Sequence, residues 1–139
     1  MSILVLIGRV LFVSLFLSSG FGHLTKSEGM AGYAKSKGVP AARLMVIASG
    51  VLLLAGGLML LLGVWADLGA LFLFAFLIPT PLLMHAFWKE TDPMSKQMEQ
   101  IQFSKDIALA GAALMLFALI SYVGNDLGLT LTGPLFHLK

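Results

Sequence analysis

The stretch Leu68–Trp88, LGALFLFAFLIPTPLLMHAFW, decides the fold class of this chain. It is apolar over about twenty residues, the length of an α-helix that crosses a bilayer. Its second half also contains Pro79, Thr80, Pro81 and His85, which a simple lipid-embedded anchor does not need. We therefore expect a membrane-spanning helix at about residues 67–88, and its second half is the first candidate for a functional site.

The composition of the whole chain belongs to the same class. Of its 139 residues, 58% are hydrophobic and only 12% are charged, and the mean hydropathy is +0.94. Soluble domains are about 45–50% apolar and about 25% charged. The length allows one domain, 1–139, with about four spans and no separate soluble domain. The chain contains no cysteine, which excludes thiol–disulfide exchange, thiolate nucleophiles and cysteine-ligated metals within it.

Three further apolar segments complete an all-α, integral membrane four-helix bundle. We expect them at about residues 3–22, 42–62 and 105–122. The first has no preceding Lys or Arg and no small-residue cleavage site, so we expect it to remain as a helix and not to act as a signal peptide. It contains Arg9, whose long side chain we expect to reach the headgroups in preference to pairing with Asp67.

The segments between the spans are polar. In residues 24–40, Met30, Tyr33 and Ala34 have helical spacing, which favours a short interfacial helix over an ordinary loop. Residues 89–104 read as a solvated loop with room for a short helix. LAGGLMLLL at Leu54–Leu62 resembles LAGAALMLF at Leu109–Phe117. This similarity raises the possibility of two helical hairpins related by a pseudo-twofold axis along the membrane normal.

The distribution of basic residues predicts the orientation. One end of the bundle would carry most of them: Lys26, Lys35, Lys37, Arg43, Lys89, Lys96 and Lys105. The other end has only Arg9 and Lys139. An excess of Lys and Arg marks cytoplasmic loops, so we expect loops 24–40 and 89–104 in the cytoplasm and both termini outside, in the inner (plasma) membrane.

The directions of the helices place five ionisable residues at about the same depth: His23, Arg43, His85, Lys105 and Asp106. Ionisable groups within membrane spans usually face the bundle interior or a wet cavity. One hypothesis is axial ligation of haem or another tetrapyrrole such as chlorophyll by the two histidines. A second is a hydrogen bond from His85 to a quinone carbonyl, assisted by Lys105 or Arg43. The third is an interfacial histidine that only donates to a carbonyl or to Asp106. No catalytic residue and no metal site is predicted.

Pro79 and Pro81 leave backbone carbonyls near Ala75 and Leu77 without donors, which Thr80 could help to satisfy. The resulting bend either improves packing alone or opens a cavity, in which case His85 lies one turn from Pro81.

The order of these motifs resembles the DoxX family of small four-helix membrane proteins, from Ile7 to about Ala118. The most specific pieces are Arg9, Gly38-Val39-Pro40, Gly56-Gly57 followed by Gly63, the late third-helix His85, and Lys105-Asp106 at the entry to the fourth helix. Many members have a Lys near the position of His23 and a Glu near that of Leu53, so any role of that acid is absent here.

The resemblance implies association with membrane redox complexes, because the family takes its name from a small subunit of a thiosulfate:quinone oxidoreductase. We therefore expect a small accessory or anchoring subunit of such a complex, not catalytic alone, with a soluble partner at its basic loops and a quinone site near His85. The alternatives are a non-catalytic membrane interaction or assembly protein and a tetrapyrrole-bearing subunit.

Overall fold

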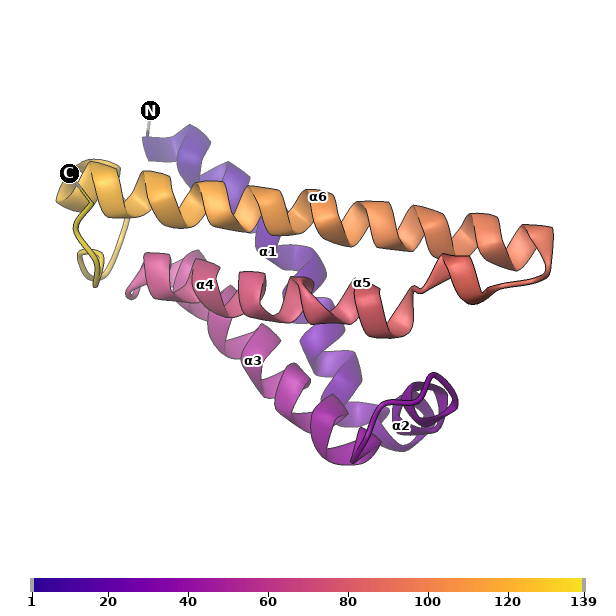
Figure 1. Cartoon of the computed structure of the whole chain (residues 1–139). Coiled ribbons are helices and arrows are strands. Elements are labelled where there is room, and N and C mark those ends of the chain that lie inside the picture. Colours follow the sequence, from indigo (N-terminus) through magenta and orange to yellow (C-terminus); the bar gives the residue numbers. More distant parts are fainter. Residues whose placement is uncertain (1, 139) are drawn as a thin grey trace.

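The computed structural model describes residues 2–138, and all regular structure in this range is helical (Figure 1). The long helices are α1 (Ser2–Thr25), α3 (Ala42–Leu62), α4 (Ala66–Leu77) and α6 (Pro93–Val123). The short elements are α2 (Ser27–Ser36), α5 (Pro79–Met84) and the single turns η1 (Phe87–Lys89) and η2 (Gly124–Leu127). Four segments are long and apolar enough to cross a membrane: Ser2–Thr25, Ala42–Leu62, Ala66–Lys89 and Pro93–Leu127. The predicted all-α fold with four spans is confirmed.

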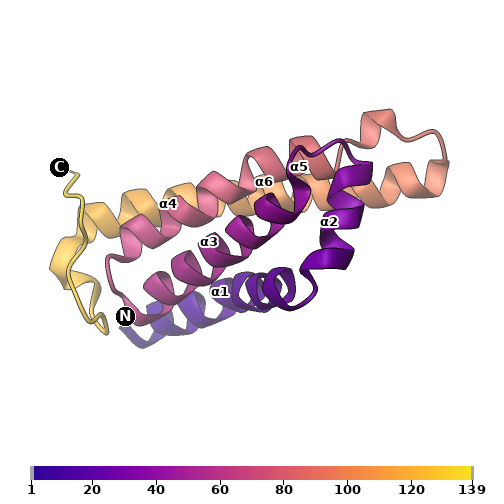
Figure 2. The same ribbon diagram turned by 90° about the horizontal axis from the view of Figure 1, so that it is seen from below.

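The helices form two antiparallel pairs, α1 with α3 and α4 with α6, which meet where α3 packs on α4. Both termini lie at one end of the bundle, here called the terminal end, and α2 lies at the other, here called the α2 end (Figures 1 and 2). The short helix expected in residues 24–40 is present as α2, and the chain leaves it through Gly38, whose φ is +85°. The proposed twofold relation between the two pairs stays a prediction.

Glycines set the close approach of the helices. A Cβ atom at Gly56 would lie 2.9 Å from the carbonyl oxygen of Gly69, and one at Gly69 would lie 2.8 Å from that of Gly56. A Cβ atom at Gly20 would lie 3.0 Å from the carbonyl oxygen of Gly50. Small residues allow such backbone contact between membrane helices. Leu53, beside the Gly20 contact, is completely buried in the apolar core.

The third span is not one continuous helix. It breaks between α4 and α5, and the helical backbone ends at Met84, before His85. The reason is that Pro79 and Pro81 have no N–H to donate along the helix. Thr80 compensates in part, because its hydroxyl donates to the carbonyl of Phe76 at 2.6 Å. The span expected at about residues 67–88 is present as Ala66–Lys89, with the interruption at the prolines, but its helical backbone ends at Met84, earlier than expected.

The fourth long helix begins well before the expected residue 105. Its first residue is Pro93, and Asp92 caps it by accepting a hydrogen bond from the backbone N–H of Ser95 at 2.8 Å. Proline suits a first helical position because no intrahelical bond is lost there. A helix of 31 residues is about 46 Å long, more than the roughly 30 Å of a bilayer core. The segment 89–104 is thus mostly an extension of α6 and not a loop.

At the terminal end, the expectation that Arg9 reaches the headgroups is wrong. Arg9 is only 2% exposed, and its Nη2 donates to the carbonyl of Leu129 at 2.5 Å. Nη1 lies 3.5 Å from the carbonyl of Leu60. The C-terminal tail folds back over this end of the bundle and supplies an acceptor 120 residues away in sequence. Arg9 therefore binds backbone carbonyls in the interior.

Asp67 fastens the same tail. Its carboxylate accepts hydrogen bonds from the backbone N–H groups of Leu135, at 3.0 Å, and Phe136, at 2.6 Å. The hydroxyl of Ser121 lies 3.5 Å from Oδ2. Asp67 is completely buried, and these donors replace the water that its carboxylate lacks. The terminal end is thus closed by a polar network between α1, α4, α6 and the tail.

Candidate functional site

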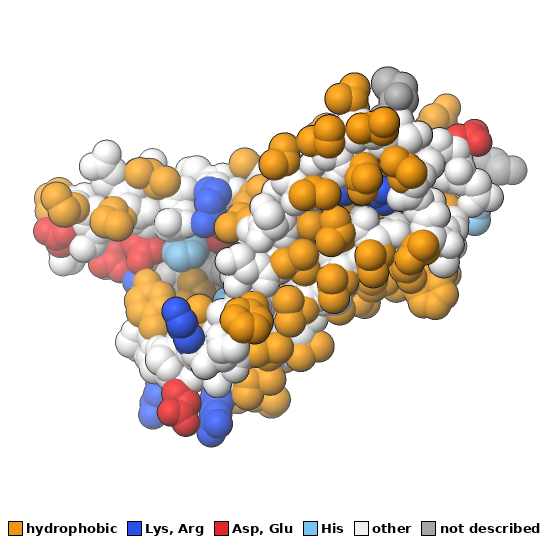
Figure 3. All heavy atoms as spheres, turned by 180° about the vertical axis from the view of Figure 1, so that it is seen from behind, with side chains coloured by type: hydrophobic (Ala, Val, Ile, Leu, Met, Phe, Trp, Pro, Cys, Tyr) orange, Lys and Arg blue, Asp and Glu red, His pale blue; other side chains and the backbone are white. Residues whose placement is uncertain are grey.

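At the α2 end the helices diverge and leave a cavity of about 790 Å³. Its walls come from α1 and α3 on one side and from α4, α5 and α6 on the other, and α2 contributes at its mouth. In Figure 3 the surface is hollowed between α2 and the N-terminal part of α6, where a histidine and several acidic side chains gather. Cavities that hold small organic ligands measure about 300–1,000 Å³ and are mostly apolar. Apolar side chains also predominate here, including Leu15, Phe16, Leu52, Phe76, Leu83 and Leu109.

His85 lies on the cavity wall just after the end of α5. Its Nδ1 atom is 2.7 Å from Oε2 of Glu99, and its Nε2 atom is 3.7 Å from Oδ2 of Asp106. Glu99 and Asp106 are seven residues apart on α6, so they lie on the same face of that helix two turns apart. The carboxylate of Glu99 thus fixes Nδ1 of the ring, and the carboxylate of Asp106 lies near Nε2.

Asp106 and Lys105 reach the cavity from α6. Asp106 is 7% exposed, and its Oδ1 atom lies 3.7 Å from Nζ of Lys105. Nζ of Lys105 also donates to the side-chain amide oxygen of Gln102. The buried carboxylate of Asp106 therefore has Nζ of Lys105 on one side and Nε2 of His85 on the other, but neither is within hydrogen-bond distance.

His23 lines the same cavity from α1. Its Nδ1 atom lies 2.7 Å from the hydroxyl oxygen of Ser49 on α3, and its ring packs edge-on against Phe76 of α4 with centroids 6.0 Å apart. The Cβ atom of His23 also packs tightly against α3, where a Cβ atom at Gly50 would come within 2.9 Å of it. Its orientation is fixed from two sides.

Four of the five predicted site residues thus line one cavity, namely His23, His85, Lys105 and Asp106. Arg43 does not line it. It lies at the start of α3, and its guanidinium faces Glu28 of α2 at 3.9 Å with both side chains largely exposed. α2 packs against α3, and Arg43 lies on the side of α3 that faces α2 and solvent.

Sequence reasoning missed Glu99, which joins three elements. Its Oε1 atom accepts a hydrogen bond from the hydroxyl of Tyr33 at 3.0 Å and lies 3.4 Å from Nζ of Lys37, both from α2. Nζ of Lys37 also donates to Glu90 at 2.9 Å. The spacing of seven between Glu99 and Asp106 would have identified it, had the helix been expected to begin at Pro93.

This network fixes the ionisation of its members at the mouth of the cavity. The hydrogen bond to Glu90 raises the pKa of Lys37, so the ammonium form is favoured. Partial burial, and then donation to Glu99, raise the pKa of Tyr33, so its hydroxyl stays a donor. These bonds connect α2 to α6 across the mouth.

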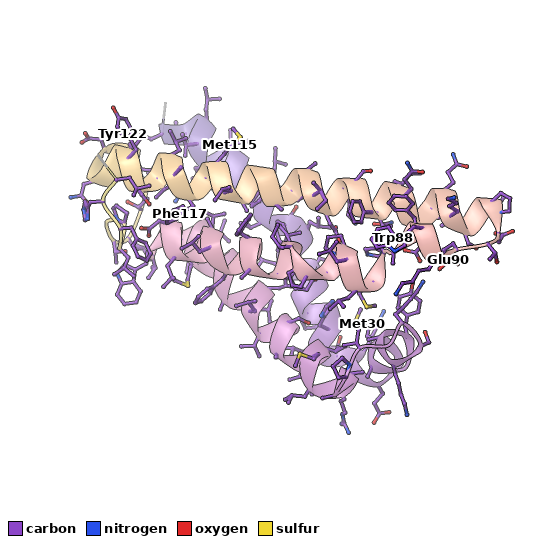
Figure 4. The ribbon with its side chains drawn as sticks, viewed as in Figure 1. Met30, Trp88, Glu90, Met115, Phe117 and Tyr122 are labelled. Atoms are coloured by element: carbon purple, nitrogen blue, oxygen red, sulfur yellow. The ribbon has the colours of Figure 1, made fainter. Side chains whose placement is uncertain are left out.

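Aromatic contacts hold the connection between α5 and α6 in place. The ring of Phe87 packs edge-on against both Trp88 and Phe103, and Trp88 also packs against Phe103. Figure 4 shows Trp88 and Glu90 near the start of α6, at the same end of the molecule as Met30 of α2. By contrast, Met115 and Tyr122 are on the outer face of α6, where each is more than 70% exposed. The site therefore lies in the ordered α2 end, and the outer faces of the helices are left to lipid.

Among residues 2–138, no group of three or more His, Cys, Asp or Glu side chains is arranged to hold a metal ion. The polar side chains of the cavity are hydrogen-bonding groups and imidazoles, and they lie at one end of an apolar volume.

Comparisons with known proteins agree with this architecture. The family model of DoxX matches residues 4–86, which contain α1 from its third residue, α2 to α5, and His85. The inner membrane protein YqjF of Escherichia coli (strain K12) is 30% identical over 112 residues, which cover 81% of this chain and 80% of YqjF. The inner membrane protein YphA of the same organism is 31% identical over 116 residues, with 82% and 81% covered. No solved structure matches the chain significantly. The chain therefore belongs to the DoxX family and is an integral membrane protein.

Proposed function

We propose that this protein is a small accessory or anchoring subunit of a membrane redox complex, and that its cavity binds the head group of a membrane quinone. The observation that carries this proposal is His85, which Glu99 holds at the polar end of an apolar cavity of about 790 Å³. A quinone has a polar ring with two oxygen atoms and an apolar tail. The apolar walls suit the tail, and the polar end suits the ring oxygens.

The position of the cavity also suits a ligand that arrives through the bilayer. It lies between the α1–α3 pair on one side and α4, α5 and α6 on the other, at the end where these helices diverge. Exposed apolar side chains cover the adjoining outer faces of the helices, for example Leu82 of α5. A lipophilic molecule would therefore need no passage through water.

The quinone proposal is tested by photolabelling purified protein with an azidoquinone that carries a decyl tail. We expect the label in the peptides that contain His85 or His23, and we expect His85→Leu to remove most of it. His137→Leu is the matched control, because His137 belongs to the C-terminal tail and does not line the cavity. Equal labelling of His85→Leu and the unmodified protein would contradict the proposal.

The surface at the α2 end supports docking of a soluble partner. Lys26, Lys35, Lys89 and Lys96 are all exposed there, and we propose that this end faces the cytoplasm. Isolation in mild detergent, followed by mass spectrometry, tests this part. We expect a stoichiometric partner that carries a redox cofactor, and reversal of Lys35 and Lys96 to Glu should release it. A stoichiometric partner without a redox cofactor would favour the assembly-protein alternative.

The two histidines also support a second candidate, a tetrapyrrole-bearing subunit. Both line one cavity, and both have Nδ1 engaged by a protein oxygen, an arrangement that orients imidazoles for axial ligation through Nε2. An absorption spectrum of protein isolated from its native membrane separates the candidates. A Soret band that His23→Leu or His85→Leu abolishes would favour the tetrapyrrole and count against the quinone.

A further inference from the structure

We propose that the cavity prefers the reduced quinol form of its ligand, because its polar end presents hydrogen-bond acceptors. This inference rests on the proposed quinone function and specifies the ligand further. A quinol offers two hydroxyl donors, whereas the oxidised quinone offers only carbonyl acceptors. The preference therefore follows from the number of donors and acceptors that remain free on the wall.

The first acceptor is Nε2 of His23. The hydroxyl of Ser49 has one proton, and that proton is given to the carbonyl of Val46 at 2.8 Å. The same hydroxyl oxygen lies 2.7 Å from Nδ1 of His23, so it must accept the Nδ1 proton. A neutral imidazole carries one N–H, and Nε2 of His23 is then an acceptor.

The second acceptor is the carboxylate of Asp106. It lines the cavity, and the two neighbouring nitrogen atoms, Nζ of Lys105 and Nε2 of His85, each lie 3.7 Å away. Hydrogen bonds of N–H to O are about 2.7–3.2 Å long, so this carboxylate keeps lone pairs for another donor. A phenolic hydroxyl is such a donor.

The potential donors on the wall are mostly used by the protein itself. The hydroxyl of Tyr33 donates to Glu99 and that of Thr80 to the carbonyl of Phe76. The ammonium of Lys105 has three N–H donors: one goes to Gln102, and because 45% of this side chain is exposed, the other two can be hydrated at the mouth of the cavity. Ser19 also lines the cavity, and its hydroxyl serves equally as donor or acceptor. The balance of free groups favours a ligand with two hydroxyls over one with two carbonyls.

The test compares three ligands that share a decyl tail: a benzoquinol, the matching benzoquinone and the quinol 1,4-dimethyl ether. Affinities are measured anaerobically on the full chain in nanodiscs. We expect the quinol to bind at least about tenfold more tightly than the other two, because hydrogen bonds to a carboxylate contribute about 1.5–3 kcal/mol, which is roughly tenfold or more. The ligand comparison needs no variant, so a folding defect cannot obscure it.

Two variants assign the effect to its residues. Asp106→Asn keeps the size of the side chain and replaces one acceptor oxygen by a donor, so it should remove most of the quinol preference and strengthen quinone binding. Arg43→Gln should leave the preference unchanged, because Arg43 does not line this cavity. Equal affinities for quinol and quinone would overturn this inference and leave the proposed function intact. Absence of binding by all three ligands would overturn both.

Discussion

The imidazole of His85 and the carboxylate of Glu99 form a hydrogen bond of 2.7 Å between Nδ1 and Oε2. The second oxygen of this carboxylate accepts from Tyr33 of α2 at 3.0 Å. One acidic side chain of α6 therefore holds the histidine that faces the cavity and the short helix that lies over its mouth. A substitution of Glu99 should therefore affect both the orientation of His85 and the attachment of α2.

Replacing Glu99 by Gln should weaken binding of the decyl quinol by roughly tenfold. The change removes the charge that orients His85, and hydrogen bonds to charged groups are about twice as strong as neutral ones. Glu28→Gln is the control, since Glu28 is exposed and lies near Arg43, away from the cavity. Equal affinities of the two variants in nanodiscs would show that Glu99 does not position the site.

The ionisation of Tyr33 reports on the same network. Partial burial and donation to Glu99 raise its pKa above the ordinary value of 10.0, because both disfavour the phenolate. A raised folded-state pKa means that the contribution of Tyr33 to stability is complete below pH 10 and is lost as the pH rises through the folded-state pKa.

Tyr122 is the only other tyrosine, so Tyr122→Phe isolates the signal of Tyr33. In that background, phenolate absorbance should have its midpoint above 10.0. Adding Glu99→Gln should lower the midpoint, because the charged acceptor is lost. A midpoint that does not respond to Glu99→Gln would contradict the contact between α2 and α6.

The crossing of α3 and α4 should tolerate no side chain at Gly56. In Gly56→Ala the new methyl group would lie 2.9 Å from the carbonyl oxygen of Gly69, and this atom belongs to backbone that cannot rotate away. We expect a loss of about 1–3 kcal/mol, as for other overpacked interiors. Gly111→Ala on α6 is the matched control, since no atom lies within 4 Å of its added Cβ. Equal melting temperatures of these two variants in detergent would contradict the close crossing.

Much of this fold follows from the sequence, because apolar length alone specifies a membrane helix. The direction of each helix then brought His23, His85, Lys105 and Asp106 to one depth, and these four do line one cavity. The direction of a helix across the membrane gives no information about its rotation about its own axis, however. Arg43 has the right depth but faces α2 and solvent.

Two differences between prediction and structure concern contacts between residues far apart in the chain. Arg9 and Asp67 each bind the C-terminal tail, and their partners lie 120 and 68 or 69 residues away. No local pattern indicates such contacts. The omission of Glu99 has a local reason: the mixed charges of residues 89–104 predict a loop, whereas Asp92 and Pro93 together are typical of a helix start.

Labelling of single cysteines tests the orientation of the protein. The chain contains no cysteine, so Lys35→Cys on α2 and Leu131→Cys in the tail each introduce a unique thiol. A membrane-impermeant maleimide applied to intact spheroplasts should label Leu131→Cys and leave Lys35→Cys unlabelled until the cells are lysed. The opposite pattern would reverse the proposed orientation.

The tail at the terminal end should detach when Asp67 loses its charge. Asp67→Asn removes the carboxylate that accepts from the backbone N–H groups of Leu135 and Phe136. Hydrogen bonds to charged groups contribute about 1.5–3 kcal/mol each. The bundle itself should persist, because its core packs on other residues of α4 such as Leu73 and Leu77.

Limited proteolysis in detergent measures this release directly. We expect chymotrypsin to cut Asp67→Asn near Phe136 at least about tenfold faster than the unmodified protein, since the cleavage rate follows the population of the open form. Asp126→Asn is the control, because Asp126 is exposed and lies in η2, outside this set of bonds. If both variants are cut at the rate of the unmodified protein, Asp67 does not hold the tail. If both are cut faster than the unmodified protein and at the same rate, the attachment depends on the overall charge of this end and not on the hydrogen bonds to Leu135 and Phe136.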